Sequence, residues 1–179
     1  MNDLIILAAL LEHPKHGYRL KREAGLILGQ RDLHNNLVYP LLRRFVSEGL
    51  VTQKVVPGKR GQTRKLYALT MQGRRTLIER LSEYSEQDAQ SSDAFLWRVG
   101  LFGVLSLDVR ERILAAREKA LRTKDEHLSA LQQAVKLGVY GGDIVDHLRE
   151  TIQTDLNWIR HLRQFQKKRI QKKQKGRLK

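Results

Sequence analysis

The sequence contains no cysteine, only three prolines and few aromatic residues, which make up 6% of its 179 residues. Without cysteine, neither a disulfide framework nor a thiolate metal site can form, which favours a reducing cytoplasm. The first apolar run, residues 4–11, is too short to cross a bilayer and lacks the flanks of a secretory signal. We therefore expect a cytoplasmic protein whose first helix is buried.

Residue sets for catalysis are also missing. The six histidines are scattered, and His13 and His16, which straddle Pro14, have no second ligand pair at helical spacing. The sequence has no glycine-rich phosphate loop, and no serine or acid pair has a recognisable catalytic context. The sequence therefore indicates a protein that is not an enzyme and binds no metal or cofactor.

Positive charge is what the sequence has in excess, because 34 Lys and Arg against 19 Asp and Glu give a net charge of +15. Residues 1–80 hold 15 cationic and 6 acidic side chains, residues 81–162 hold 10 and 13, and residues 163–179 hold 9 and 0. A charge that serves solubility alone needs no such segregation. The basic start and end therefore predict binding to a polyanion.

The pattern of residues 1–84 predicts three helices, a hairpin of two strands and a further helix. Pro14 and Gly29 end the first two helices, a turn rich in Pro and Gly separates the strands, and Thr70 is placed to cap the last helix. The expected elements are helices 3–12, 18–28 and 36–48, strands 51–56 and 63–69, and a helix through residue 81. This is the outline of a winged helix-turn-helix, in a chain that is mostly α-helical.

The third helix of this set has apolar side chains at helical spacing, from Val38 to Phe45. Asn35 and Asn36 are suited to cap it. Pro40 is tolerated only in or near the first turn, where backbone N–H groups lack partners anyway. Gly49 then stops the helix.

The second half is expected to be helical. A short helix covers residues 95–105, and Ser106 caps a long helix that reaches about Leu137. Along it, apolar residues recur every seven positions from Leu107 to Val135, and a glycine-rich turn at 138–142 precedes a last helix that starts near residue 143. Alone, this helical hairpin leaves much of its apolar stripes uncovered, so a partner is expected. The residues assigned to dimerisation are Leu114, Leu121, Leu128, Leu148, Ile152, Leu156 and Ile159.

These elements define four expected regions. Residues 1–84 form a winged-helix DNA-binding domain, 85–93 a polar linker without apolar period, 94–165 a helical dimerisation domain, and 166–179 a basic tail. The tail is expected to be disordered at its end and to add non-specific DNA affinity. Anionic lipid is the less favoured partner, because the tail has no continuous apolar face.

Two surfaces are candidates for DNA contact. Cations of the strand hairpin can lie over a phosphate backbone or enter a minor groove. The start of the third helix can reach base edges in a major groove, with two arginines one turn on for phosphates. Helix capping by the two asparagines, and packing of the tyrosine against the hairpin, are the alternatives. The residues are Lys59, Arg60, Arg64 and Lys65 in the hairpin, and His34, Asn35, Asn36, Tyr39, Arg43 and Arg44 in the helix.

A series of short motifs also follows in a set order through residues 4–75. They are His16-Gly17-Tyr18, Val38-Tyr39-Pro40-Leu41-Leu42-Arg43-Arg44, Glu48-Gly49-Leu50-Val51, and Arg64-Lys65-Leu66-Tyr67-Ala68-Leu69-Thr70-Met71-Gln72-Gly73-Arg74. Together they resemble the PadR family of bacterial transcriptional regulators. The rest of the chain resembles the branch with a longer, virulence-activator-like helical domain, through Asp93-Ala94-Phe95-Leu96 and the closing helices.

The resemblance implies a homodimer that presents two wings to one DNA duplex at an inverted repeat near a promoter. Some relatives sense small aromatic molecules near the dimer interface, which makes Trp97 a candidate effector contact, although packing in a core or interface is the more usual role of tryptophan. The segment His34-Asn35-Asn36-Leu37 departs from the family pattern, so the operator sequence stays unassigned.

Two other functions fit the same residues. One is a non-specific, nucleoid-type DNA binder that uses the hairpin and the tail as a polycation. The other is a protein-interaction module that works through its helical hairpin. RNA binding has less support, since single-stranded RNA is bound on aromatic platforms and the aromatic content is low.

Overall fold

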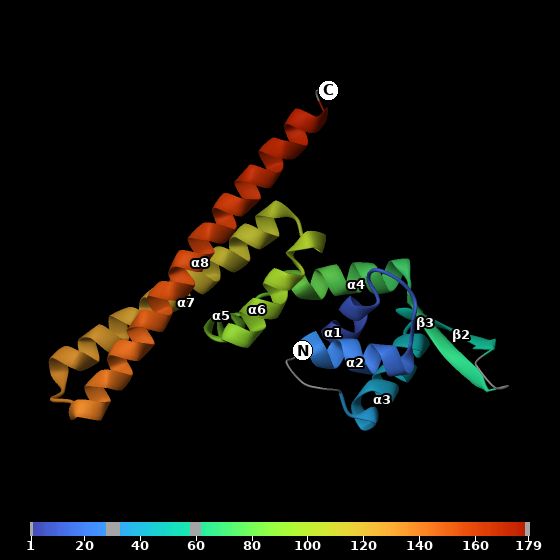
Figure 1. The fold of residues 1–179 in the computed structure, drawn as a ribbon, viewed down its shortest axis with the longest axis horizontal. Helices are drawn as coiled ribbons and strands as arrows, with labels where there is room; N and C mark the ends of the chain where they lie inside the picture. Colours follow the sequence, from blue (N-terminus) through green and yellow to red (C-terminus); the bar gives the residue numbers. More distant parts are fainter. Residues whose placement is uncertain (1, 28–32, 58–61, 178–179) are drawn as a thin grey trace. The chain divides into compact units, whose positions relative to one another are not determined.

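In the computed structural model, residues 2–27, 33–57 and 62–177 are described. They divide into two compact units, which are best considered one at a time (Figure 1). The first unit comprises Met1–Glu83 and Leu96–Leu105, and the second comprises Tyr84–Phe95 and Ser106–Lys179. Most of the described chain is helical, and the strands form one antiparallel sheet in the first unit.

The first unit is a winged helix-turn-helix, as the sequence predicts. Fully buried apolar side chains such as Leu20, Phe45 and Leu77 join its helices into one core. The sheet has the order β1-β3-β2, and β2 and β3 pair from Val51↔Leu69 to Pro57↔Thr63. Its elements are α1 (Asn2–Ala9), β1 (Lys15–His16), α2 (Gly17–Ile27), α3 (Asn35–Ser47), β2 (Val51–Pro57), β3 (Thr63–Leu69) and α4 (Met71–Ser82).

The start of this unit differs from the prediction. The first helix ends at Ala9 instead of residue 12. The residues after it lead into β1, a strand that the hydrophobic pattern of the sequence did not predict. Strand β1 pairs with β3 and carries the buried Lys15, whose Nζ donates to the Ala9 carbonyl at 2.5 Å and lies 2.6 Å from the Glu23 carboxylate. The pair lowers the pKa of Glu23, chiefly through the hydrogen bond from Lys15. The predicted stop at Gly29 lies outside the described residues.

Helix α3 begins one residue earlier than predicted. Its N-cap is His34, which makes no side-chain capping bond, so the capping predicted for Asn35 and Asn36 is wrong. Pro40 is the sixth residue of the helix and therefore lies beyond the first turn. The predicted stop is confirmed, because Gly49 has a φ of 71°, which suits glycine.

Helix α3, the two long strands and α4 are tied together at Leu50. The Leu50 N–H donates to the Phe45 carbonyl at 2.9 Å, and the Leu50 carbonyl accepts from the Thr70 N–H at 3.0 Å. Thr70 also caps α4, as predicted, by accepting from the Gly73 N–H. A Cβ on Gly73 would lie 2.0 Å from the Leu50 carbonyl oxygen, so only glycine fits there. We call Leu50, Thr70 and Gly73 the helix–strand junction.

The segment predicted as a linker, residues 85–93, contains a short helix, α5 (Glu86–Gln90). Ser85 and Asp88 form a capping box there, which offsets the lack of an apolar stripe. Helix α6 (Ser92–Gly100) and a 3₁₀ turn (Phe102–Val104) follow. Residues 96–105 group with the first unit, whereas the prediction placed them with the helical domain.

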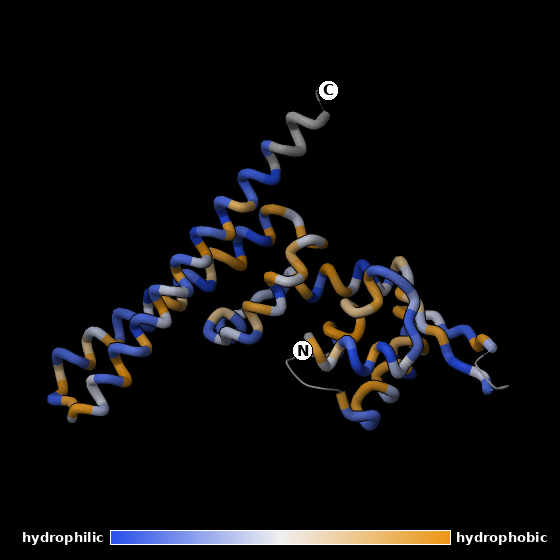
Figure 2. The backbone as a smooth tube through the Cα atoms, in the orientation of Figure 1, coloured by the Kyte–Doolittle hydropathy of each residue, from blue (hydrophilic) through white to orange (hydrophobic). Residues whose placement is uncertain are grey.

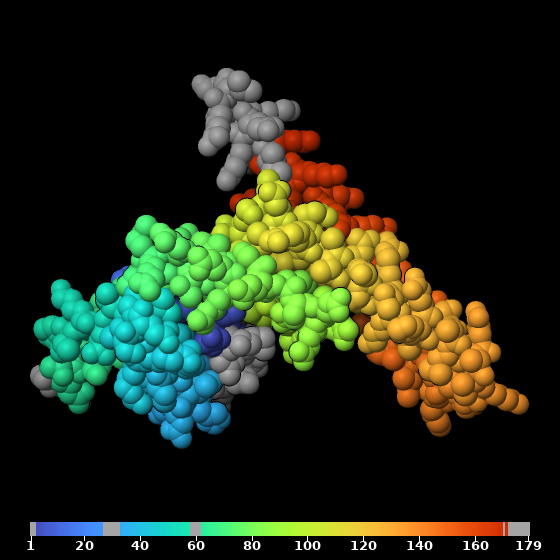
Figure 3. All heavy atoms as spheres, turned by 180° about the vertical axis from the view of Figure 1, so that it is seen from behind, coloured from blue at the N-terminus to red at the C-terminus, as the bar shows by residue number. Residues whose placement is uncertain are grey.

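The second unit is dominated by the predicted helical hairpin. Ser106 caps α7 (Leu107–Ala134) by accepting from the Val109 N–H. Helix α8 (Val139–Arg177) starts four residues before the predicted position. It also continues through residue 177, so the prediction of a disordered tail is wrong up to that residue. Figure 3 shows the two helices in contact near the hairpin turn, in orange.

The residues assigned to dimerisation lie between α7 and α8 of one chain. Two of them, Leu128 and Leu148, are half-buried. The other five are buried, because each helix covers the apolar stripe of the other: Leu114, Leu121, Ile152, Leu156 and Ile159. Within one chain, these side chains therefore stabilise the hairpin. They would contact a partner only if a helix were exchanged between subunits, which the sequence leaves open.

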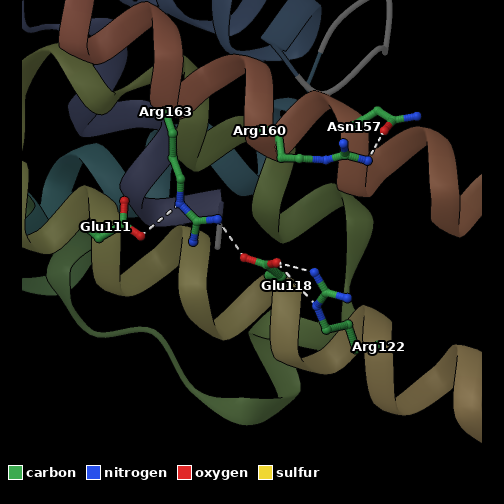
Figure 4. A network of polar contacts seen from close by, with 6 residues as sticks. All are labelled: Glu111, Glu118, Arg122, Asn157, Arg160 and Arg163. Atoms are coloured by element: carbon green, nitrogen blue, oxygen red, sulfur yellow. Dashed lines mark hydrogen bonds and ion pairs between the residues drawn. The ribbon is translucent and has the colours of Figure 1, made fainter.

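Ion pairs reinforce the hairpin along its outer faces. The Arg163 guanidinium lies 2.8 Å from the Glu111 carboxylate and 2.5 Å from that of Glu118, which also accepts from Arg122 (Figure 4). Deeper in the unit, Arg117 joins α7 to α8 through Asp155 at 2.9 Å. Its guanidinium also donates to the Ala89 carbonyl at the end of α5.

Candidate nucleic-acid interface

Helix α3 has one buried face and one polar face. Val38, Leu42 and Phe45 are buried against the core. The predicted base-contacting residues are all exposed, and Asn36, Tyr39 and Arg43 fall on one face at the spacing i, i+3, i+7. The structure thus brings together the polar residues at the start of α3 that the sequence singled out.

The ring of Tyr39 is placed by a close contact with the start of α2. A Cβ built on Gly17 would lie 2.9 Å from Cε1 of Tyr39, closer than real side chains pack. Glycine at this position therefore allows α3 and α2 to approach each other. On the other side of the start of α2, Nδ1 of His16 lies 3.2 Å from the Lys65 carbonyl of β3.

These contacts surround an open cavity of about 620 Å³ on the first unit. It is formed where the start of α2, the exposed face of α3 and strand β3 meet. Of the nine residues that line it, four are arginine or lysine, one is histidine and three are tyrosine. The nine are His16, Gly17, Tyr18, Arg19, Tyr39, Arg43, Arg64, Lys65 and Tyr67. We call this the basic cavity.

Most of the charge in the basic cavity is not neutralised. Arg19 forms an ion pair with Glu23 at 2.6 Å. Among the described residues, no carboxylate pairs with Arg43, Arg64 or Lys65. Unpaired cations beside exposed hydroxyl groups are what a phosphate group requires.

Tyr67 forms the floor of the basic cavity and is 4% exposed. Burial raises the pKa of its phenol, nearby Tyr39 raises it further, and Arg43 lowers it. Its hydroxyl therefore stays protonated at neutral pH and is able to donate a hydrogen bond to an anion.

Arg44 differs from its neighbour Arg43. Its guanidinium lies 3.5 Å from the Glu48 carboxylate and 3.9 Å from that of Asp3, and it stacks over the ring of Phe45. Asp3 also binds Arg80 at 3.1 Å. The two carboxylates weaken the field of Arg44, so its predicted contact with phosphate has less support than that of Arg43.

The ribbon of β2 and β3 projects from the helices of the first unit, in teal in Figure 3. Arg64 and Lys65 are exposed near its free end, opposite Val56 and Val55. Lys54, also exposed, adds a cation that the sequence interpretation did not include. Lys59 and Arg60 lie outside the described residues.

Trp97 occupies a different place from the candidate interface. It is 9% exposed, with the Arg98 guanidinium 5.2 Å from its ring centroid. It lines neither the basic cavity nor the larger cavity of about 720 Å³ between α5 and α7. Its role as an effector contact stays a prediction.

Several residues of the basic cavity were not assigned a site role from the sequence. Four of them lie in β1, at the start of α2 and in β3: His16, Tyr18, Arg19 and Tyr67. The signal was present, because His16, Tyr18 and Tyr67 lie in the motifs that resemble a known family. What was missing was the pairing of β1 with β3, which brings these segments together.

Two other kinds of site were sought in the described part of the chain. None of its helices has the length and apolar content needed to span a membrane. Over the same residues, no group of three or more His, Cys, Asp and Glu side chains is arranged to hold a metal ion.

The first unit thus combines a winged helix-turn-helix fold with a basic cavity on its surface. Residues 6–79 match the model of the Transcriptional regulator PadR-like family. Over these residues the chain is therefore similar to that family of transcriptional regulators. No curated protein matches the chain.

Solved structures of similar proteins include PadR of Bacillus subtilis in complex with operator DNA, at 19% identity, covering 89% of this chain and 95% of that one, with a TM-score of 0.45. A PadR family regulator of Eggerthella lenta is 34% identical over 43% of this chain and 65% of its own, with a TM-score of 0.38. A transcriptional regulator of Thermoplasma acidophilum is 28% identical over 44% and 74%, with a TM-score of 0.41. Each of these TM-scores is below 0.5, so the likeness to the PadR-like family rests on the match over residues 6–79.

Proposed function

We propose that this protein is a transcriptional regulator that acts as a homodimer and binds an inverted-repeat operator sequence-specifically. In each subunit, the start of α3 enters a major groove and reads bases with Asn35, Asn36 and Tyr39. The β2–β3 ribbon lies along the phosphate backbone or in the adjacent minor groove. Half-sites lie about one helical turn apart, as in other helix-turn-helix dimers.

The basic cavity is the observation that carries this proposal. Three of its cations, Arg43, Arg64 and Lys65, have no carboxylate partner among the described residues, and they lie beside the exposed face of α3. Phosphate groups held in the cavity would fix the position of the protein on the duplex. Asn36 and Tyr39, which share a face with Arg43, would then be placed against base edges.

Exposed apolar side chains at the turn of the helical hairpin support the homodimer. Such a cluster is unusual on a monomer and is typical of a protein interface. We propose that a second copy of the chain covers it. The residues and their exposed fractions are Leu131 (42%), Val135 (49%), Val139 (88%), Tyr140 (83%) and Ile144 (58%).

The test is a fluorescence-anisotropy titration with the duplex DNA just upstream of the protein's own gene and with a scrambled duplex of equal length. The salt concentration is held at about 150 mM, because affinity for DNA is uninterpretable without it. A preference of about a thousandfold for one natural duplex supports specific regulation. If the upstream duplex shows none, selection of sites from genomic DNA supplies the natural duplex.

Asn36→Ala and Arg75→Ala form a matched pair for the base contact. Arg75 is exposed on α4 and does not line the basic cavity. We expect Asn36→Ala to reduce the preference for the selected sequence by about 10- to 100-fold, which corresponds to about 1–3 kcal/mol for a base contact. Arg75→Ala should leave it unchanged. If Asn36→Ala, Asn35→Ala and Tyr39→Ala all keep the preference, the start of α3 does not read bases.

Two results would favour the alternatives. Equal affinity for every duplex, with strong salt dependence, would identify a non-specific nucleoid-type binder. DNA binding no tighter than that of a generic basic protein would point to a protein-interaction module. A monomer in light scattering at micromolar concentration, for both the free protein and its DNA complex, would exclude the homodimer.

A further inference from the structure

Helix α8 extends past the end of the helix that it pairs with. Helix α7 begins at Leu107, and Arg163 of α8 contacts Glu111, one turn into α7. Because the two helices are antiparallel, α8 has passed the start of α7 within about one turn of Arg163. The remaining stretch, residues 167–177, continues as a helix past the start of α7, and at its base Arg169 still lies near Arg110 of α7 (Figure 1). We call this stretch the basic arm.

The basic arm contains no acidic residue. It holds seven cations: Lys167, Lys168, Arg169, Lys172, Lys173, Lys175 and Arg177. The last acidic residue before it is Asp155, so no carboxylate lies one turn away to pair with these cations. Lys167, Lys168 and Arg169 are exposed, and α8 is largely blue in Figure 2 just before its grey end.

Like charges already repel each other at the base of the arm. Arg169 stacks over the exposed ring of Phe165, with 5.7 Å to the ring centroid. The pKa of Arg110 is lowered first by burial and then by the charge of Arg169. A helix of this charge that contains no acidic residue gains stability from a polyanion that lies along it.

We propose that the basic arm is a second nucleic-acid site, which binds the phosphate backbone without reading sequence. This inference rests on the proposed function, because the duplex held by the winged helix is the polyanion that it takes. Duplex DNA carries one charge per about 1.7 Å of its axis, and a helix rises about 1.5 Å per residue. A helix with a cation in every turn therefore meets a phosphate wherever it lies along the duplex.

Other polyanions fit the arm less well. An amphipathic helix that lies on a membrane needs an apolar face. Within the arm the only apolar residue besides Gly176 is Ile170, so little apolar surface is available to enter the lipid. The winged-helix unit also brings DNA to the same molecule, which raises the local concentration of phosphate near the arm.

The experiment compares two full-length variants that each lose four positive charges. The arm variant is K167Q/K168Q/K172Q/K173Q, in which glutamine keeps the helix propensity of lysine. The control variant is R112Q/K119Q/K124Q/K136Q, which removes exposed cations from the body of the same unit. Affinity for a scrambled duplex and for the preferred duplex is measured between about 50 and 300 mM salt, a range of about sixfold that resolves the slope.

We expect the arm variant to lower affinity for both duplexes by about tenfold or more at 150 mM salt, with the preference between them unchanged. The slope of log affinity against log salt should fall by about 0.9 for each phosphate that the arm no longer neutralises, so by about 2–4 in all. The control variant should change the slope by less than the value for a single phosphate. Circular dichroism checks that both variants keep their helix content.

Equal salt slopes for the two variants would overturn the proposal. It would also be overturned if the arm variant lost only its binding to phosphatidylserine vesicles, which would identify the arm as a lipid site. The scrambled duplex keeps this test apart from the proposed function. An absence of sequence preference refutes specific regulation, whereas the arm is judged by its effect on the salt slope alone.

Discussion

The arginines that join the helices of the second unit differ in their partners from two arginines of the basic cavity. In the second unit, arginines are matched with carboxylates, as in Arg117 with Asp155, Arg149 with Asp125, and Arg163 with Glu111 and Glu118. In the basic cavity of the first unit, Arg43 and Arg64 have no such partner among the described residues. The first set stabilises the protein itself, and the second leaves charge for a ligand. Substitutions should therefore separate stability from DNA affinity.

Arg117→Ala should have the largest effect of the substitutions considered, and this effect should be on the stability of the fold. Arg117 is 3% exposed and donates to Ala89, Ser92 and Asp155, so its removal leaves the buried Ala89 carbonyl and the half-buried Asp155 carboxylate without this donor. We expect the free energy of unfolding to fall by about 3 kcal/mol. Arg122→Ala is the control, because its pair with Glu118 is exposed and should contribute less than about 1 kcal/mol. Denaturant titration of both variants measures this, and equal decreases would contradict the assignment.

Arg43→Ala should affect DNA affinity and spare stability. If Arg43 donates to a phosphate, its removal costs about 1.5–3 kcal/mol, or roughly 10- to 100-fold in affinity. Arg44→Ala should weaken binding less, since Glu48 and Asp3 already lie near its guanidinium. Fluorescence anisotropy at a fixed salt concentration measures the DNA affinity of both variants, and thermal melting measures their stability. A larger fall in affinity in Arg44→Ala would reverse the roles that we assign to these neighbours.

Gly17→Ala should lower DNA affinity by less than Arg43→Ala does, and it should favour the helical conformation of α2. Alanine is the better helix former, so α2 itself should not be weakened. Its Cβ would lie 2.9 Å from the Tyr39 ring, which must shift. We expect DNA affinity to fall by several-fold, about 1 kcal/mol, with little change in melting temperature. Gly100→Ala, whose Cβ would meet nothing within 4 Å, is the control. Unchanged affinity would show that the position of Tyr39 does not matter.

The smallest effect concerns pH and Glu118. Hydrogen bonds from Arg163, and then from Arg122, lower the pKa of Glu118 below its ordinary value of 4.5. A lowered pKa means that this carboxylate stabilises the fold fully above that value and loses its contribution as the pH falls through the folded-state pKa. The stability difference between the wild type and Glu118→Gln should therefore shrink as the solution is acidified below that value, by less than about 1 kcal/mol. A difference that stays constant down to pH about 3 would exclude the effect.

The winged-helix fold could be predicted from the sequence because its signals are local. The strand limits at residues 63 and 69, the cap at Thr70 and the stop at Gly49 all depend on neighbouring residues, and the structure confirms them. The two-residue strand β1 could not be predicted, because it exists only through its pairing with β3. For the same reason, the sequence predicted that cations of the hairpin and residues of α3 belong to the site. It did not predict the cavity in which these residues meet.

The second unit shows another limit of sequence patterns. A seven-residue repeat indicates that one helix packs against another, but not whether that helix belongs to the same chain. Leu114 and Ile159 were assigned to a partner, and the structure buries them between α7 and α8 of one chain. The run of positive charge after residue 166 suggested disorder. The structure continues α8 through it, because Lys and Gln are good helix formers when nothing breaks the chain.

The helix–strand junction has a consequence for how such a regulator could change its target. Leu50, Thr70 and Gly73 join α3 to the ribbon mainly through backbone groups, and none of the three is exposed at the tip of α3. The distance between the part that would read bases and the part that would hold the backbone is thus independent of which side chains stand at positions 35, 36 and 39. Those positions are free to vary without a compensating change elsewhere, so new operator preferences would arise by single substitutions in an unchanged frame.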